Sequence, residues 1–92
     1  MKIVINSCYG GFGLSDFAVE ALGLESRFDF IDRIDHRLIK LIEDYGAEKV
    51  GDDYSALTVA IVPDAATDWT IEEYDGLESI IYVLDGKLHY AY

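Results

Sequence analysis

The residue types that could carry chemistry are concentrated in a glycine-rich stretch near the N-terminus, from Asn6 to Ser15. Three of four consecutive positions are glycine: Gly10, Gly11 and Gly13. Glycine adds backbone entropy that folding must remove, so such a loop indicates positive φ angles or the close approach of another group. An apolar run precedes the loop and a helical pattern follows it. A strand, a glycine loop and a helix N-terminus together can hold an anion through free backbone N–H groups.

The stretch therefore predicts a binding site for a small anionic ligand, such as a nucleotide. Its predicted ligand-binding residues are Asn6, Cys8, Tyr9, Gly10, Gly11, Phe12, Gly13 and Ser15. The Gly-Gly-x-Gly spacing matches neither the Walker nor the Rossmann pattern, and the lysine of a P-loop is missing. The alternative is a tight turn that lets the following helix pack against the sheet.

Two residues elsewhere in the chain complete the predicted site. Arg33 is one of only seven cationic residues, and its planar guanidinium suits a phosphate or a carboxylate. Tyr74 offers an aromatic ring on which a base can stack, as do Tyr9 and Phe12. The alternatives are an ion pair between Arg33 and a nearby acid, and core packing for the aromatic rings.

Catalytic and metal-binding patterns are weaker. Cys8 follows a strand and could be a nucleophile with His36 or His89 as its base, but no third orienting group is identifiable, and a buried apolar cysteine is the alternative. Acids crowd one predicted turn: Glu72, Glu73, Asp75 and Glu78. They could hold a divalent metal, yet carboxylates around a turn are more often solvated. We therefore predict no catalytic residue, no metal and no cofactor.

The bulk composition bounds the class of protein. The chain has 92 residues, of which 51% are hydrophobic, so we expect a single domain over residues 1–92. A domain this small has a thin stability margin, which favours a homodimer or higher homo-oligomer. With 18 acidic and seven basic residues, the formal net charge of −11 disfavours direct binding to nucleic acid or to anionic membranes. The single cysteine and the lack of a signal peptide or membrane span indicate a cytoplasmic protein.

Hydrophobic periodicity predicts an α+β fold. We expect strands over 2–6, 57–62, 69–74, 77–84 and 88–92, and helices that follow Ser15 and Asp35 and end at Gly23 and Gly46. The segment 24–32 hints at a short strand at Phe28 to Phe30, and 47–55 is expected to be a loop. Asp75-Gly76 and Asp85-Gly86 are typical of type I′ turns. The predicted architecture is a single sheet of four to five mostly antiparallel strands, with two helices packed on one face.

Several blocks of the chain resemble a group of small, largely uncharacterised proteins of bacteriophages and prophages. The opening Met-Lys-Ile-Val-Ile-Asn-x-Cys-Tyr-Gly-Gly-Phe-Gly-Leu-Ser carries the resemblance, and the strand ending in Ile-Val-Pro-Asp and the block from Trp69 to Glu78 are similar to later parts of that family. The chain departs from the family at His36, where relatives have proline, and in its C-terminal tail, which lacks their His-Arg pair. The resemblance implies a phage origin and a soluble α+β fold, and hence a cytoplasmic location in the infected or lysogenic host. It implies no established activity.

These observations give three hypotheses for function. The first is a small-ligand binding protein without catalysis, which by analogy with other phage proteins would sequester a nucleotide immune signal of the host. The second is an acidic protein-binding inhibitor that imitates nucleic acid toward a host enzyme. The third, ranked last, is an enzyme that uses Cys8 or a carboxylate near Asp75.

Overall fold

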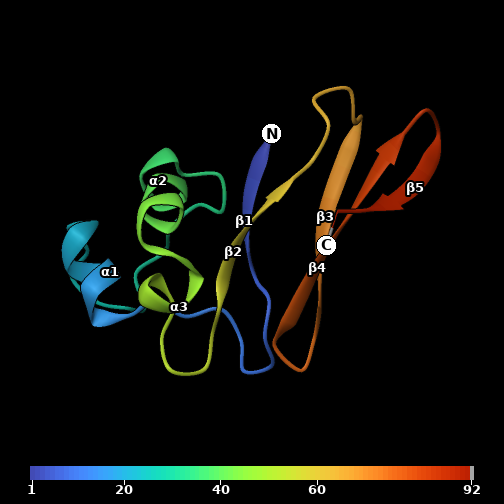
Figure 1. Ribbon diagram of the computed structural model, residues 1–92. Helices are drawn as coiled ribbons and strands as arrows, with labels where there is room; N and C mark the ends of the chain where they lie inside the picture. The colour runs from blue at the N-terminus through green and yellow to red at the C-terminus, as the bar shows by residue number, and fades with distance from the viewer. Residues whose placement is uncertain (92) are drawn as a thin grey trace.

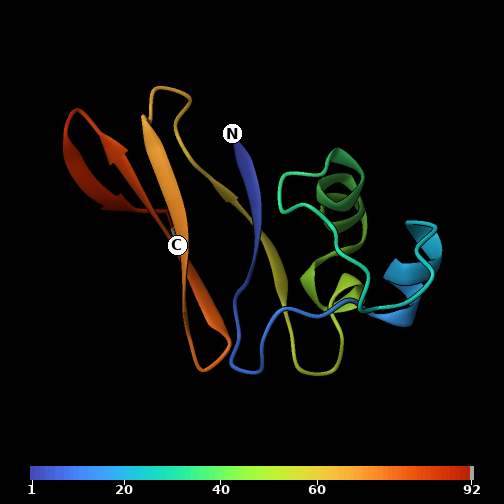
Figure 2. The ribbon, with the colours of Figure 1, turned by 180° about the vertical axis from the view of Figure 1, so that it is seen from behind.

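The computed structural model describes residues 1–91, which form three layers (Figure 1; Figure 2, from behind). The elements are β1 (Lys2–Asn6), α1 (Asp16–Ala21), α2 (His36–Tyr45), α3 (Ala47–Val50), β2 (Leu57–Ile61), β3 (Asp68–Tyr74), β4 (Leu77–Leu84) and β5 (Lys87–Tyr90). The three short helices lie on one side of the β1–β2 pair, and the β3–β4–β5 sheet lies on the other side. The fold is therefore α+β, as predicted.

Strand β1 is the centre of this arrangement. Ile3, Val4 and Ile5 are each fully buried. Val4 belongs to the apolar cluster beneath the helices, whereas Ile3 and Ile5 belong to the cluster between the two sheets. Since successive side chains of a strand point to opposite faces, a strand covered on both faces is apolar at every position. This explains the uninterrupted apolar run at the start of the chain.

The prediction of a single sheet is wrong. Strands β1 and β2 form a two-stranded antiparallel sheet, and β3, β4 and β5 form a separate three-stranded antiparallel sheet. Ile80 of β4, with Trp69, Ile71 and Tyr82 beside it, packs on the β1–β2 pair. The period-two pattern shows that a strand has an apolar face, but it does not say whether that face packs on another sheet or whether the strand extends an existing sheet edge.

The helix boundaries follow the predicted caps. The Ser15 hydroxyl accepts a hydrogen bond from the Ala18 N–H at the start of α1, and the Asp35 carboxylate accepts one from the Arg37 N–H at the start of α2. Helix α2 ends at Gly46, whose φ is +92°. Two predictions in the connecting segments were wrong: residues 47–50 form α3 rather than a loop, and no strand occurs between residues 24 and 32.

The C-terminal meander has the expected order. Strand β4 has the predicted bounds, β3 begins one residue early, and β2 ends one residue early. Both residues of each two-residue turn have positive φ, as type I′ turns require. The last strand begins at Lys87 and ends at Tyr90, and the predicted last residue of that strand, Tyr92, lies outside the described residues.

Candidate functional site

Three loops from distant parts of the sequence meet at one end of the molecule. They are the glycine loop (residues 7–14), the 51–56 loop and the 75–76 turn, and we call this region the loop end (Figure 1, bottom). The Gly10 N–H donates to the Asp75 carbonyl over 3.1 Å. The Cys8 thiol lies 3.1 Å from the Tyr54 carbonyl oxygen. The predicted glycine loop is therefore joined directly to both of its neighbours.

Glycine is required where these loops touch. A Cβ on Gly10 would overlap the Tyr54 carbonyl oxygen, and a Cβ on Gly76 would overlap the backbone nitrogens of Gly10 and Gly11. Gly13 lies against the Asp52 carboxylate, which is the end of a side chain and not backbone, so of these three glycines only Gly10 and Gly76 are fixed by a neighbouring main chain. At Gly10 and Gly76 the group that approaches the backbone closely is another loop of the protein, and it is not the helix that follows the glycines.

Asn6 is buried at the junction and uses its side chain to hold all three loops. Its amide nitrogen donates to the carbonyls of Cys8 and Gly76, each over 2.7 Å. Its side-chain oxygen accepts from the Ala56 N–H at 3.0 Å. Because a buried amide without partners is costly, this set of bonds explains a fully buried asparagine next to an apolar strand.

The guanidinium of Arg33 is occupied by the protein itself. It forms a bidentate ion pair with Glu78, with N–O distances of 2.7 and 2.8 Å, and donates to the Val4 carbonyl at 3.1 Å. Its other side covers the Phe12 ring, with Cζ 3.8 Å from the ring centroid. The Glu78 side chain is 7% exposed and that of Arg33 is 25% exposed. The structure therefore realises the ion-pair alternative for Arg33.

Ser15 lies beside a hollow of about 350 Å³ between α1, α3 and the 51–56 loop. Two cationic side chains, Arg27 and Lys49, line it. Four acids also line it: Asp16, Glu48, Asp52 and Asp53. The surroundings of the α1 N-terminus are therefore acidic on balance, and the cap position is already filled by Ser15.

The loop end presents three tyrosines to solvent: Tyr9 and Tyr54 lie in two of the loops, and Tyr74 ends β3 directly before the 75–76 turn. Tyr9 is 63% exposed, and Tyr54 and Tyr74 are each 72% exposed. Tyr9 and Tyr74 were predicted from the sequence as site residues, whereas Tyr54 was not. The only sequence signal for Tyr54 was its place in a polar loop between two aspartates and a serine, because its proximity to the glycine loop is a tertiary contact.

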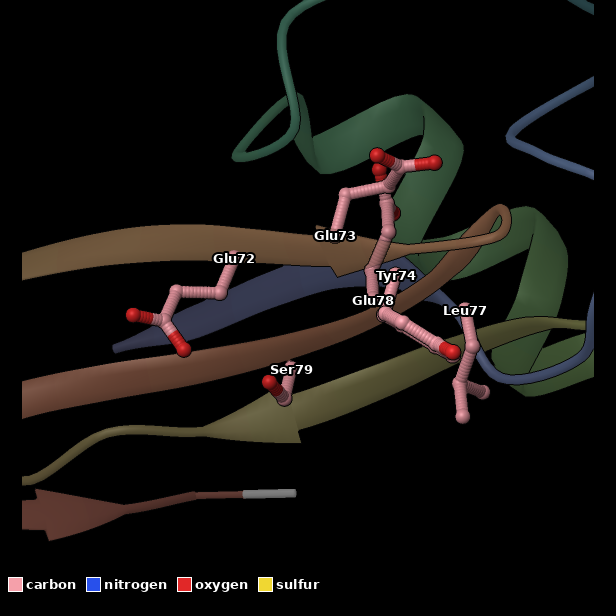
Figure 3. A pocket seen from close by; sticks show the side chains of 6 residues that line it. All are labelled: Glu72, Glu73, Tyr74, Leu77, Glu78 and Ser79. Atoms are coloured by element: carbon pink, nitrogen blue, oxygen red, sulfur yellow. The ribbon is translucent and has the colours of Figure 1, made fainter.

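A second hollow, of about 240 Å³, lies on the β3–β4 hairpin next to the loop end (Figure 3). Its lining residues are Glu72, Glu73, Tyr74, Leu77, Glu78 and Ser79. Glu73 accepts from the Gly76 N–H at 2.6 Å and Glu78 binds Arg33, whereas Glu72 lies apart from Glu73. The carboxylates do not converge on one point, and residues 1–91 contain no group of three His, Cys, Asp or Glu side chains placed to hold a metal ion.

The residues considered for nucleophilic catalysis are not brought together. The thiol of Cys8 contacts the Tyr54 carbonyl and the Asn6 side-chain oxygen. His36 begins α2 in the helical layer. His89 lies on β5 in the outer sheet, where its ring stacks on Tyr82 with a centroid distance of 5.3 Å. The geometry therefore contains no pairing of Cys8 with a histidine base.

The chain matches no family model, and no curated protein or solved structure matches it. None of the helices among residues 1–91 is long and apolar enough to cross a membrane. The features of the molecule that bear on function are the loop end, its charge and its exposed side chains.

Proposed function

We propose that the protein works by binding, without catalysis, a partner protein that carries a positively charged surface, and that the loop end makes the contact. The observation that carries this proposal is the meeting of three interlocked loops, beside which Tyr9, Tyr54 and the last residue of β3, Tyr74, are exposed. Tyrosines on loops rich in serine, glycine and aspartate form effective protein-binding surfaces, because the ring offers a large contact area at low entropic cost.

The rigidity of the loop end supports this role. The Asn6 side chain, the Gly10–Asp75 hydrogen bond and the packing of Gly76 hold the three loops in one arrangement. A binding surface that is already ordered loses less conformational entropy when its partner arrives. The glycines thus serve protein binding indirectly, by positioning the exposed tyrosines.

The charge supports a basic partner. Asp53 and Asp75 are exposed in the same loops as the tyrosines, and Glu72 and Glu73 lie on the adjoining hairpin. With a net charge of −11, the chain attracts a positively charged surface over a long range and repels an acidic one. A host enzyme that normally binds nucleic acid carries such a surface, and the resemblance to phage proteins supports an encounter in the bacterial cytoplasm. We take the acting species to be a homodimer.

A small anionic ligand, such as a nucleotide immune signal, is the second candidate. The observation in its favour is the hollow beside Ser15, where Arg27 and Lys49 could face a phosphate while Tyr54 lines the rim. The four acids of that hollow and the engagement of Arg33 by Glu78 count against it. For this reason the basic partner ranks first.

The test is the capture of bacterial proteins on the immobilised chain at about 0.05 M and about 1 M salt. A basic partner held by charge is retained at low salt and lost at high salt. Tyr54→Ala and Tyr74→Ala are expected to reduce its retention at least tenfold, which is the usual scale of an aromatic hot spot. Asp75→Asn is expected to weaken retention several-fold, because it removes one charge from the loop end.

The matched control is Asp85→Asn. Both aspartates are exposed and hold the first central position of a type I′ turn, where asparagine fits equally well, but Asp85 lies at the far tip of the β4–β5 hairpin. If Asp75→Asn and Asp85→Asn reduced retention of the partner equally, the loop end would not be the contact surface. A thermal-shift screen against nucleotides forms the second arm: a ligand that stabilises the native protein but not Lys49→Gln, which changes a cation in the hollow beside Ser15, would favour the small-ligand candidate instead.

A further inference from the structure

The edge strand β5 is the outermost element of the three-stranded sheet. It pairs with β4 on one side, and no other described element lies on its second side (Figures 1 and 2). Leu88 and Tyr90 of this strand are 72% and 68% exposed. They are directly opposite Val83 and Ile81 of β4, so they share the face of the sheet that points away from Ile80 and the core.

The backbone groups at this edge can be assigned from the pairing with β4. The Ala91 N–H donates to the Ile80 carbonyl, so the backbone groups of Ala91 point toward β4. In an antiparallel pair these directions alternate along the strand. The N–H and C=O groups of Leu88 and Tyr90 therefore point outward, whereas those of Lys87 and His89 point toward β4.

The two edges of this sheet differ in how they are protected. The β3 edge carries Asp68, Glu72 and Glu73. Charged side chains on an edge strand commonly prevent it from pairing with a strand of another molecule. The β5 segment from Gly86 to Ala91 contains no aspartate or glutamate, and its basic side chains are Lys87 and His89. In a chain with a net charge of −11, this is a place where a second, equally acidic copy can approach with little local repulsion.

We propose that β5 pairs antiparallel with β5 of a second copy about a two-fold axis, which joins two three-stranded sheets into one sheet of six strands. The outward groups select the register: Leu88 lies opposite Tyr90 of the partner copy, and His89 lies opposite His89 of the partner copy. This register forms four backbone hydrogen bonds and places the exposed Leu88 and Tyr90 side chains in cross-strand contact. The inference rests on the homodimer of the proposed function and specifies its interface.

The pairing and the binding of a basic partner respond to salt in opposite directions. Screening weakens the attraction between the acidic loop end and a positive surface. The same screening reduces the repulsion between two copies with a net charge of −11 each, so the dimer tightens as salt rises. The two proposals can therefore be separated with one solution variable.

The test uses cysteine cross-linking in a Cys8→Ser background, because Cys8 is the single cysteine of the chain. In the proposed register, residue 89 forms a non-hydrogen-bonded pair with its own copy, at a Cα separation of about 4.5 Å, which a disulfide can bridge. Residue 88 lies diagonal to its own copy at about 7 to 8 Å, beyond ordinary disulfide reach. His89→Cys is therefore expected to cross-link at least tenfold more than its matched control, Leu88→Cys.

Sedimentation of the native chain, and non-reducing electrophoresis of the oxidised variants, give the readouts. A native dimer together with selective cross-linking through His89→Cys supports the proposal. A native dimer with no cross-linking of His89→Cys, or with equal cross-linking of Leu88→Cys, overturns the β5 interface and leaves the homodimer standing. A native chain that stays monomeric at every protein and salt concentration overturns both the β5 interface and the homodimer. Thermal melting of the reduced variants confirms that each one is folded.

Discussion

The two hairpin turns of the outer sheet have the same sequence and the same backbone, but their surroundings differ completely. Asp75-Gly76 and Asp85-Gly86 both place an aspartate near φ +50° before a glycine with positive φ. A Cβ on Gly86 would have no heavy atom within 4 Å, whereas one on Gly76 would overlap the backbone of the glycine loop. The first turn therefore packs against the glycine loop and joins the outer sheet to it, whereas the second turn has no neighbour at Gly86.

The same contrast separates two ion pairs. Arg33 and Glu78 are largely buried and join the helical side of the molecule to the outer sheet. Arg37 and Asp35 are two residues apart in sequence and lie at the surface, where the Arg37 side chain is 65% exposed. In both comparisons similar groups lie in different surroundings, so the energetic role of each feature comes from its neighbours.

The largest expected effect is the difference in stability between glycine-to-alanine variants of the two turns. Gly76→Ala is expected to lower the free energy of unfolding by at least about 4 kcal/mol, because the methyl group has to displace the glycine loop. Gly86→Ala meets no neighbour and is expected to cost about 1–2 kcal/mol for its left-handed backbone. Urea unfolding of both variants measures the difference. Costs that agree within about 1 kcal/mol would contradict the assignment of one turn as a joint.

The next effect concerns the buried ion pair. Glu78→Gln is expected to destabilise the protein by about 3 kcal/mol, at the lower end of the range for a broken buried pair because Arg33 keeps some solvent contact. A double-mutant cycle with Arg33→Met is expected to show strong coupling, since either single change leaves the other charged side chain without its ion-pair partner. Additive effects of the two substitutions, each below about 0.5 kcal/mol, would mean that the pair does not join the layers.

The elements of the fold could be predicted from sequence, but their assembly could not. Helix caps at Ser15 and Asp35 and the two Asp-Gly turns are set by neighbouring residues, so their positions were predicted correctly. The two-sheet arrangement depends on whether β3 and β4 pack their apolar face on β1 or extend the edge of its sheet. A period-two pattern of apolar residues is the same in both cases. Helix α3 was missed because four residues next to a glycine leave almost no periodic signal.

The candidate site shows the same limit. The glycine loop was recognisable because glycines at such density need a backbone reason, and that reason was close approach. The sequence alone does not reveal that the approaching groups are Tyr54 and Gly76, which lie more than 40 positions away. For Arg33 the sequence analysis could name an acid as an alternative partner without choosing Glu78, because 18 acids were available.

The smallest expected effect tests the exposed ion pair through its pH dependence. The hydrogen bonds from the Arg37 side chain, at 3.0 and 3.2 Å, hold the pKa of Asp35 below its ordinary value of 3.8, against the opposing effect of partial burial. A carboxyl with a lower pKa in the folded state adds stability above the unfolded pKa and loses it as pH falls through the folded pKa. This contribution is therefore complete at neutral pH and disappears in acid.

Asp35→Asn is the informative variant because asparagine keeps the N-cap but does not titrate. At neutral pH we expect the native protein to be more stable than this variant by less than about 1 kcal/mol, since solvent screens an exposed pair. The gap should narrow as the pH falls below the ordinary carboxyl pKa of 3.8 and through the lower pKa of folded Asp35, as measured by urea unfolding at several pH values. Asp35→Ala, which also removes the cap, should remain less stable than the native protein at every pH. A gap between the native protein and Asp35→Asn that is constant with pH would mean that the surface pair contributes nothing, and the contrast with Arg33 and Glu78 would then be complete.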